Sequence, residues 1–179
     1  MARKDRKLLG IEMDRVSAEG YKDLPASGVV VVLDNIRSAY NVGSIFRTCD
    51  AFKADRLFLC GICAQPPSAE IHKTALGAEC SVPWEHAPET LPVIGRLRAE
   101  GYETVCVEQT VHSVKLDTFV PVEGKRYAVV LGNEVDGVQQ AVVDACDFSL
   151  EIPQFGSKHS LNVSVAAGVV LWHMRCAKH

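Results

Sequence analysis

The chain has 179 residues, of which 47% are hydrophobic and 23% charged, with a formal net charge of −3 at pH 7. This length suits one domain with a substantial core, and the slightly acidic balance gives no overall signal for nucleic acid, so such a partner would need a local basic patch. The longest apolar run, Val29–Leu33, is too short to span a membrane, and the basic N-terminus lacks the apolar segment of a signal peptide. A cytoplasmic location without a membrane partner is therefore expected.

Seven cysteines are spread through the chain, mostly among apolar neighbours. An odd, scattered set is typical of buried thiols in a reducing compartment. Cys60 and Cys63 have C-x-x-C spacing, but they follow an apolar strand, whereas a redox pair normally begins a helix that lowers the thiol pKa. With no second such pair or His pair nearby, we predict structural roles for both and no metal site.

Residues 1–24 form a short basic N-terminal extension, followed by a single domain over residues 25–179. Leu9, Met13 and Val16 lie near one face of an amphipathic helix predicted over residues 1–21. Its basic side chains fit a solvated surface helix and a grip on nucleic-acid phosphates equally well. They are Arg3, Lys4, Arg6, Lys7 and Arg15.

Strands and helices alternate along the rest of the chain. Apolar runs predict strands at 29–33, 56–60, 82–84, 104–107, 127–131 and 148–152. Helices are predicted after a polar loop at 34–44 through Phe52, and at 91–100, 138–145 and 161–176. This order predicts an α/β fold, with a parallel sheet flanked by helices on both faces.

The last helix is apolar almost all round, which predicts a buried helix rather than a surface one. Ser160 or Asn162 stands where an N-cap is expected. Taken alone, the segment favours an ordinary core helix with a capped start over a ligand site at free backbone N–H groups. The residues upstream favour the ligand site.

Three polar loops each follow an apolar strand: Asp34–Ser44, Gly132–Gly137 and Pro153–Asn162. Loops at the carboxyl ends of parallel strands converge on one crevice, where ligands bind. The loops and the helix after the first one supply Asn35, Arg37, Asn41, Arg47, Asn133, Glu134, Ser160 and Asn162. The sequence lacks the dinucleotide and P-loop signatures, a Cys–His or Ser–His–Asp arrangement and metal-ligand spacing. The crevice therefore suits recognition and charge placement.

Three segments resemble, in order and spacing, the motifs of the SpoU (TrmH-like) branch of the SPOUT RNA 2′-O-ribose methyltransferases. They are Asn41-Val-Gly-Ser-Ile-Phe-Arg47, Leu131-Gly-Asn-Glu-Val-Asp-Gly137 and Ile152-Pro-Gln-Phe-Gly-Ser-Lys-His-Ser-Leu-Asn-Val-Ser164. His72–Ala78 also resembles that branch, and the resemblance covers roughly Val29 to Trp172. Three ordered matches are far more specific than any one of them.

The resemblance implies a C-terminal deep trefoil knot, which general rules of chain topology would have excluded. It also implies S-adenosylmethionine as the cofactor and a homodimer whose second subunit helps to form the site. The cofactor-binding residues that it implies are Glu108, Leu131, Gly132, Ile152, Pro153, Ser160 and Leu161.

The catalytic residues implied by the resemblance are Arg47, Asn41, Glu134, Ser160 and Asn162. A ribose 2′-hydroxyl is a poor nucleophile, so holding it in line with the methyl group removes much of the barrier. Because an arginine side chain keeps its proton, we expect Arg47 to stabilise the developing alkoxide and anchor phosphate rather than to act as a base. His72 and His159 are expected to be loop or packing residues.

The sequence therefore predicts a metal-free, dimeric RNA ribose 2′-O-methyltransferase, with tRNA as first substrate and rRNA as second, since an exposed loop can be read by shape. Two alternatives remain. The chain could be a non-catalytic knotted RNA-binding module, which retained Arg47 and Glu134 argue against, or a flavodoxin-like nucleotide binder, which would not bind S-adenosylhomocysteine tightly.

Overall fold

The fold is built on a seven-stranded sheet. The computed structural model describes residues 6–9, 12–13, 16–17 and 20–177. Every strand pairing among them is parallel, in the order β3-β2-β1-β6-β4-β7-β5. In chain order the strands are β1 (Val29–Asp34), β2 (Arg56–Cys60), β3 (Trp84–Ala87), β4 (Glu103–Val107), β5 (Val114–Lys115), β6 (Tyr127–Gly132) and β7 (Phe148–Glu151).

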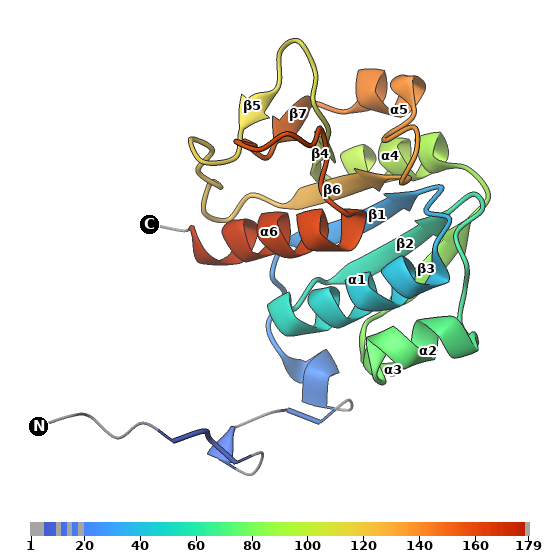
Figure 1. The fold of residues 1–179 in the computed structure, drawn as a ribbon, viewed down its shortest axis with the longest axis vertical. Helices are drawn as coiled ribbons and strands as arrows, with labels where there is room; N and C mark the ends of the chain where they lie inside the picture. Colours follow the sequence, from blue (N-terminus) through green and yellow to red (C-terminus); the bar gives the residue numbers. More distant parts are fainter. Residues whose placement is uncertain (1–5, 10–11, 14–15, 18–19, 178–179) are drawn as a thin grey trace, which may run out of the picture.

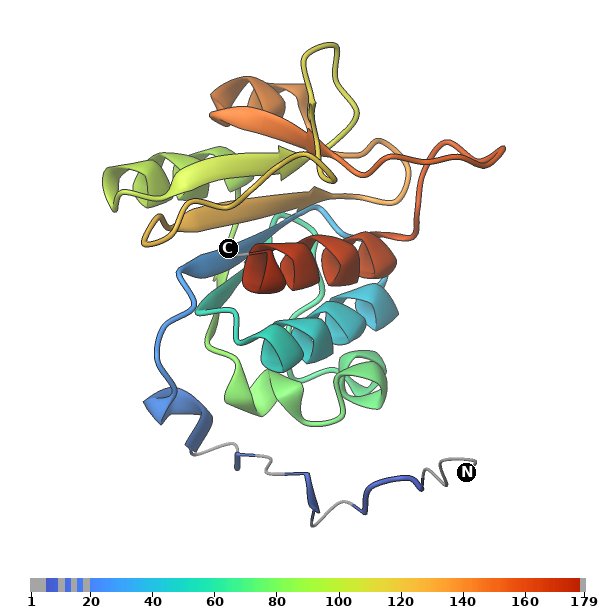
Figure 2. The ribbon, with the colours of Figure 1, turned by 90° about the vertical axis from the view of Figure 1, so that its left-hand side faces the viewer.

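Helices cover both faces of this sheet (Figure 1). One face carries α1 (Ala39–Phe52), α2 (Ala69–Ala75), α3 (Ala78–Ser81) and α6 (Val163–Cys176), and the other carries α4 (Thr90–Ala99) and α5 (Gln140–Ala145). Figure 2 shows α6 and α1 lying side by side on their face. The predicted α/β architecture is confirmed.

The central strand β1 explains why the sheet is doubly covered. All six of its residues are buried, with Val31 and Leu33 in the core beneath α1 and α6 and with Val30 and Val32 in the core beneath α4 and α5. Burying such side chains fully contributes roughly 1.5–3 kcal/mol each. The all-apolar sequence thus fixes the middle of the sheet, and its last residue, Asp34, stands at the edge where the polar loops begin.

Helix α1 begins earlier than the sequence predicted. Its N-cap is Ser38, whose side chain accepts a hydrogen bond from the Asn41 backbone, so the predicted loop is shorter and Asn41 and Ser44 lie inside the helix. A serine N-cap that closes the first turn stabilises the start of the helix, so the polar residues that follow it are helical. Gly43 then allows α2 to pack closely, because a Cβ there would collide with Thr74 and the Ile71 carbonyl.

Helix α6 is only partly buried, contrary to the prediction. Val163 and Ala167 are in the core, but the exposed fractions of Val165, Val169 and Trp172 are 51%, 38% and 56%. The helix is apolar on two faces, and the sheet covers only one of them. Its N-cap is Asn162, which accepts a hydrogen bond from the Ser164 backbone at 2.9 Å.

The helix predicted over residues 1–21 lies partly outside the described residues, including Arg3, Lys4 and Arg15. Where the chain is described, residues 6–9 and 16–17 have no helical structure, and a short 3-10 helix, η2, spans Gly20–Asp23. Leu9 and Val16 are more than half exposed, so these two side chains of the predicted apolar face gain little from burial, and short helices rarely form without such burial.

The thiols of Cys60 and Cys63 are buried, and burial raises their pKa to about 12 and about 11. Cys63 Sγ accepts a hydrogen bond from the Ile36 backbone at 3.1 Å. These features agree with the predicted structural role. Cys80 and Cys176, in contrast, are exposed. In the described part of the chain, no helix combines the length and apolar character needed to cross a membrane.

Candidate active site

A cleft of about 680 Å³ opens at the carboxyl ends of β4, β6 and β7. Its lining comes mainly from residues 107–110, 131–138, 150–152 and 160–163. Of the predicted cofactor residues, Glu108, Leu131, Gly132, Ile152, Ser160 and Leu161 line it. Pro153 is not part of the lining, although both of its neighbours are. Two of the three predicted loops therefore meet in one hollow, as the parallel sheet required.

The turn after β6 forms one wall of the cleft. The backbones of Asn133 and Gly137 exchange two hydrogen bonds of 3.0 and 3.1 Å, and Asn133 Oδ1 accepts from the backbone amides of Val135 and Asp136, each at 2.8 Å. A Cβ at Gly132 would collide with the backbone of Gly137 and Val138. Glycine at position 132 thus lets the chain fold back closely against its own strand.

Glu108 joins this turn to the end of β4. One carboxylate oxygen accepts from the Gln109 backbone at 2.8 Å, and the other accepts from the Val138 backbone at 3.1 Å. The cleft therefore has a carboxylate fixed between two of its walls.

Asp34 holds the far end of the same turn, and sequence reasoning did not single it out. The residue is fully buried, and its carboxylate accepts from Thr90 Oγ1 at 2.6 Å and from the Gln139 backbone and side chain at 2.8 and 2.7 Å. A buried charge needs such partners. The available signal was its position, a carboxylate that ends an otherwise apolar strand.

Asn41, Glu134 and Asn162 form a chain of hydrogen bonds that connects the three predicted loops. Asn41 Nδ2 donates to Glu134 at 2.8 Å, and Asn162 Nδ2 donates to Asn41 Oδ1 at 3.2 Å. Glu134 also accepts from the backbones of Arg37 and Ser38, at 3.0 and 3.2 Å. The convergence predicted for these residues is confirmed.

The electrostatics of Glu134 follow from this position. Burial alone would raise its pKa, but the hydrogen bonds from Asn41 and from the Arg37 and Ser38 amides outweigh burial and lower the pKa. The amides belong to the start of α1, where the helix dipole also favours a negative charge. Glu134 is therefore held as a carboxylate that can accept hydrogen bonds.

Arg47 lies outside both this hydrogen-bonded group and the lining of the cleft. It is exposed, two turns further along α1, and it lines a second hollow of about 850 Å³ between α1, α2 and α6. This second hollow, here called the groove, is also lined by four residues of α6: Ser164, Gly168, Val169 and Trp172. Within one chain, the structure thus groups Asn41, Glu134 and Asn162 but leaves Arg47 outside the cleft lined by Ile152 and Leu161.

Comparison with known proteins identifies a family that covers most of the chain. The family described as "SpoU rRNA Methylase family" matches residues 28–172. The chain is 28% identical over 151 residues to a Bacillus subtilis protein named 23S rRNA (guanosine(2553)-2′-O)-methyltransferase RlmP. It is 32% identical over 153 residues to a Nitrosomonas europaea protein named 23S rRNA (guanosine-2′-O-)-methyltransferase RlmB. These alignments cover 82% and 83% of the chain but only 57% and 56% of those proteins.

Solved structures show the same fold. An AdoMet-bound rRNA methyltransferase from Sinorhizobium meliloti matches with a TM-score of 0.77 and 29% identity, over 87% of this chain and 59% of that one. The A. aeolicus TrmH/SpoU tRNA modifying enzyme matches with a TM-score of 0.76 and 26% identity, over 88% and 80%. The chain thus spans little more than half the length of the two curated relatives.

Proposed function

Because this chain belongs to the SpoU rRNA Methylase family, we propose that it transfers a methyl group from S-adenosylmethionine to a ribose 2′-hydroxyl of RNA. The observation that carries the proposal is the hydrogen-bond chain from Glu134 through Asn41 to Asn162, beside the cleft. It joins the three segments that carry the resemblance.

The cleft suits the cofactor. Its volume of about 680 Å³ falls within the range of small-molecule sites. The residues that would hold the cofactor's adenine and amino-acid parts all line the cleft: Leu131, Gly132, Ile152 and Leu161. Glu108 presents a carboxylate at the same wall. When bound, S-adenosylmethionine supplies an electrophilic methyl group.

The exposed apolar side chains of α6 support a homodimer. Val165, Val169 and Trp172 follow one another at helical spacing beside the groove that Arg47 lines. We propose that a second copy packs there and that Arg47 of one subunit reaches the cleft of the other. In that position its cation would stabilise the developing alkoxide and hold phosphate. Ser160 and Asn162 would position the ribose.

The arrangement of α5 and α6 supports the implied knot. These helices lie on opposite faces of the sheet, and residues 146–162, which include β7, connect them. Residues 160–162 lie in the same cleft as the turn at 132–137, as a segment threaded past that turn would. For the substrate, tRNA is the first candidate and rRNA the second, and the similar proteins include enzymes named for each.

Methyl transfer from labelled S-adenosylmethionine to total RNA, followed by mapping of ribose methylation, tests this function. We expect labelled 2′-O-methylribose with the wild type and a loss of at least about 100-fold with Arg47→Ala. S-adenosylhomocysteine should bind both proteins equally in calorimetry. RNA binding without methyl transfer by either protein would favour the non-catalytic module, and absence of S-adenosylhomocysteine binding would favour an unrelated nucleotide binder.

A further inference from the structure

The chain leaves the cleft after Gln154 and returns to it at Ser160. Residues 155–158, here called the tip, lie between these two points and are all exposed. In Figure 2 the segment between β7 and α6 extends away from the body of the molecule. The tip therefore projects from the rim of the cleft.

The base of this loop is tied to the cleft. The His159 carbonyl accepts a hydrogen bond from Gln109 Nε2 at 2.6 Å and from Gln154 Nε2 at 3.4 Å. Gln109 follows β4 and lines the cleft, so the tether crosses from one wall to the other. The reach of the tip from the cleft is thus set by fixed contacts at its base.

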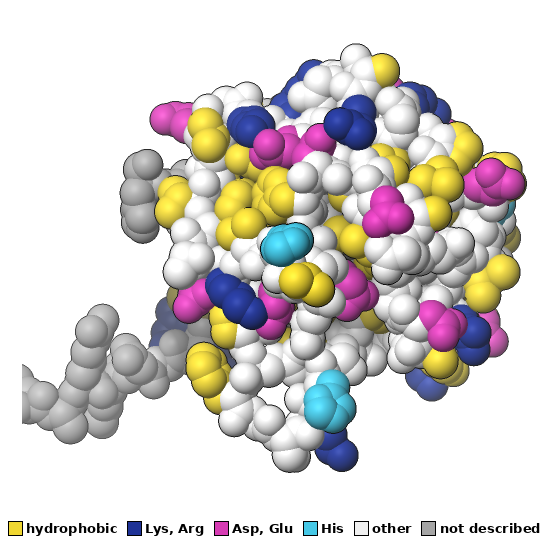
Figure 3. Space-filling view, turned by 90° about the horizontal axis from the view of Figure 1, so that it is seen from above, with side chains coloured by type: hydrophobic (Ala, Val, Ile, Leu, Met, Phe, Trp, Pro, Cys, Tyr) yellow, Lys and Arg dark blue, Asp and Glu magenta, His cyan; other side chains and the backbone are white. Residues whose placement is uncertain are grey.

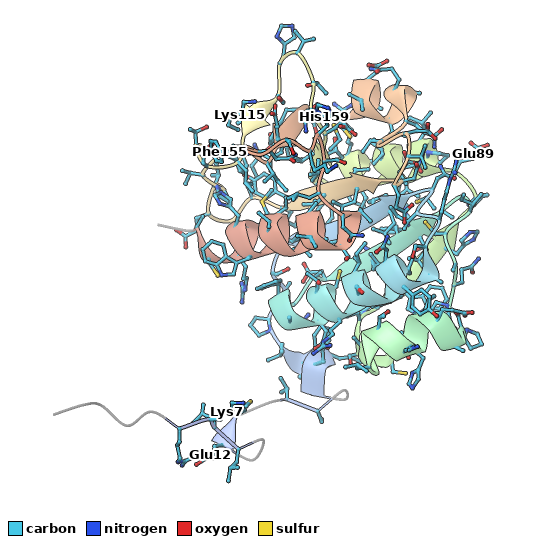
Figure 4. The ribbon with its side chains drawn as sticks, viewed as in Figure 1. Lys7, Glu12, Glu89, Lys115, Phe155 and His159 are labelled. Carbon is cyan, nitrogen blue, oxygen red and sulfur yellow. The ribbon has the colours of Figure 1, made fainter. Side chains whose placement is uncertain are left out.

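Phe155 is the most exposed large hydrophobic residue described, with an exposed fraction of 97%. Figure 4 labels it on this loop together with His159. Full burial of such a side chain would contribute roughly 1.5–3 kcal/mol, none of which the isolated chain obtains. At the rim of the cleft, an aromatic ring whose faces are both open to solvent is free to stack on a bound partner.

The two side chains of the tip, an aromatic ring and a cation, favour RNA as that partner. Residues 152–163 include Lys158 and no acidic residue, and Lys158 forms no ion pair within the described part of the chain. In Figure 3, Lys and Arg side chains are interspersed with Asp and Glu rather than gathered in one basic patch. An aromatic ring beside an unpaired cation matches a base beside a phosphate.

We propose that the tip grips the substrate RNA next to the modified nucleotide. Phe155 stacks on a base that flanks the target ribose, and Lys158 pairs with a neighbouring phosphate. This inference rests on the proposed function, because an RNA strand must enter the cleft for the tip to contact it. The tip then contributes binding rather than chemistry.

Phe155→Ala, Phe155→Leu and Phe155→Tyr test the stacking. Binding is measured with end-labelled tRNA and, separately, with rRNA, both from cells lacking the protein. On the fraction that the wild type methylates, Phe155→Ala and Phe155→Leu should weaken binding by about 5- to 150-fold, and Phe155→Tyr should retain it. KM for RNA should rise with little change in kcat, because stacking acts equally in the ground and transition states.

Leu91→Ala, which removes an exposed apolar side chain from α4, serves as the control and should bind RNA as the wild type does. Unchanged RNA binding by Phe155→Ala would overturn the stacking while leaving the methyltransferase intact. Weaker S-adenosylhomocysteine binding would instead make Phe155 a cover for the cofactor, and a smaller sedimentation coefficient would make it a subunit contact. A wild type that binds neither RNA would overturn both the tip and the proposed function.

Lys158→Gln tests the phosphate contact separately. It should reduce the slope of log affinity against log salt concentration by about one, uniformly across RNA sequences. Lys125→Gln, at an exposed lysine just before β6 and so at the end of the strands opposite the cleft, is the matched control and should leave the slope unchanged. An unaltered slope in Lys158→Gln would remove Lys158 from the inference.

Discussion

The cleft and the groove are hollows of similar size, but their polar residues are held in different ways. Glu134 and Asp34 beside the cleft each accept hydrogen bonds from at least three groups, whereas Arg47, a charged residue of the groove, is exposed. Hydrogen bonds of this kind fix a site in advance of its ligand. One chain therefore organises the cleft by itself, whereas the groove presents exposed side chains that the second copy of the proposed dimer would cover.

A mixture of two inactive variants tests directly whether Arg47 in the groove of one subunit acts on the cleft of another. Arg47→Ala leaves the cleft intact, and Gly132→Ala damages the cleft through the collision with Gly137 and Val138. If Arg47 acts across a dimer, each mixed dimer has one complete site, and co-refolded subunits should recover roughly a quarter of wild-type methyl transfer. Each variant alone should remain at least about 100-fold below wild type.

Different affinity tags on the two variants show subunit exchange, because mixed dimers alone carry both tags. No recovery in the Arg47→Ala mixture, with exchange demonstrated, would place Arg47 in its own chain's reaction.

Removing the Asp34 carboxylate should weaken the cleft from within. Asp34→Ala leaves Thr90 and Gln139 without their acceptor in a buried place, and we expect a loss of about 3 kcal/mol in the free energy of unfolding, measured in urea. S-adenosylhomocysteine affinity should fall as well, because Gln139 anchors the turn. Asp144→Ala, at an exposed carboxylate of α5, is the control. Equal unfolding free energies for Asp34→Ala and the wild type would contradict the anchoring role.

The smallest expected effect concerns pH. The pKa of Glu134 is lowered in the folded chain, so its contribution to stability is complete above pH 4.5, its ordinary value, and is lost as the pH falls through the lowered pKa. The stability of wild type minus that of Glu134→Gln should therefore shrink on acidification below pH 4.5. Urea unfolding of both proteins between pH 7 and 3 measures this difference, and a constant difference would contradict it.

The distribution of apolar and polar residues along the sequence predicted the strands of the core and the order of the main elements. The all-apolar run Val29–Leu33 could only be a strand covered on both sides, and the order of strands and helices then required a parallel sheet. Because their loops follow strands of a parallel sheet, Asn41, Glu134 and Asn162 were predicted to converge. The two-residue strand β5 was missed, because so short a pairing leaves no period in the sequence.

The remaining features depend on which elements, distant in the sequence, pack against one another. The apolar periodicity of α6 did not reveal that Val165 and Trp172 face outward, because a helix can be apolar on a face that its own chain leaves uncovered. Asp34 looked like any polar residue after a strand, and only its partners from α4 and the turn before α5 show its role. The place of Arg47 required the structure, since sequence order grouped it with Asn41.

The neighbours of β1 in the sheet have a consequence for how the chain is made. Val29 pairs with Tyr127, so one edge of the most apolar strand has no partner until β6 has left the ribosome. Pairings between such distant segments form slowly. During synthesis the exposed edge of β1 would be a site for chaperone binding or aggregation, and a nascent chain ending before β6 should be insoluble without such help.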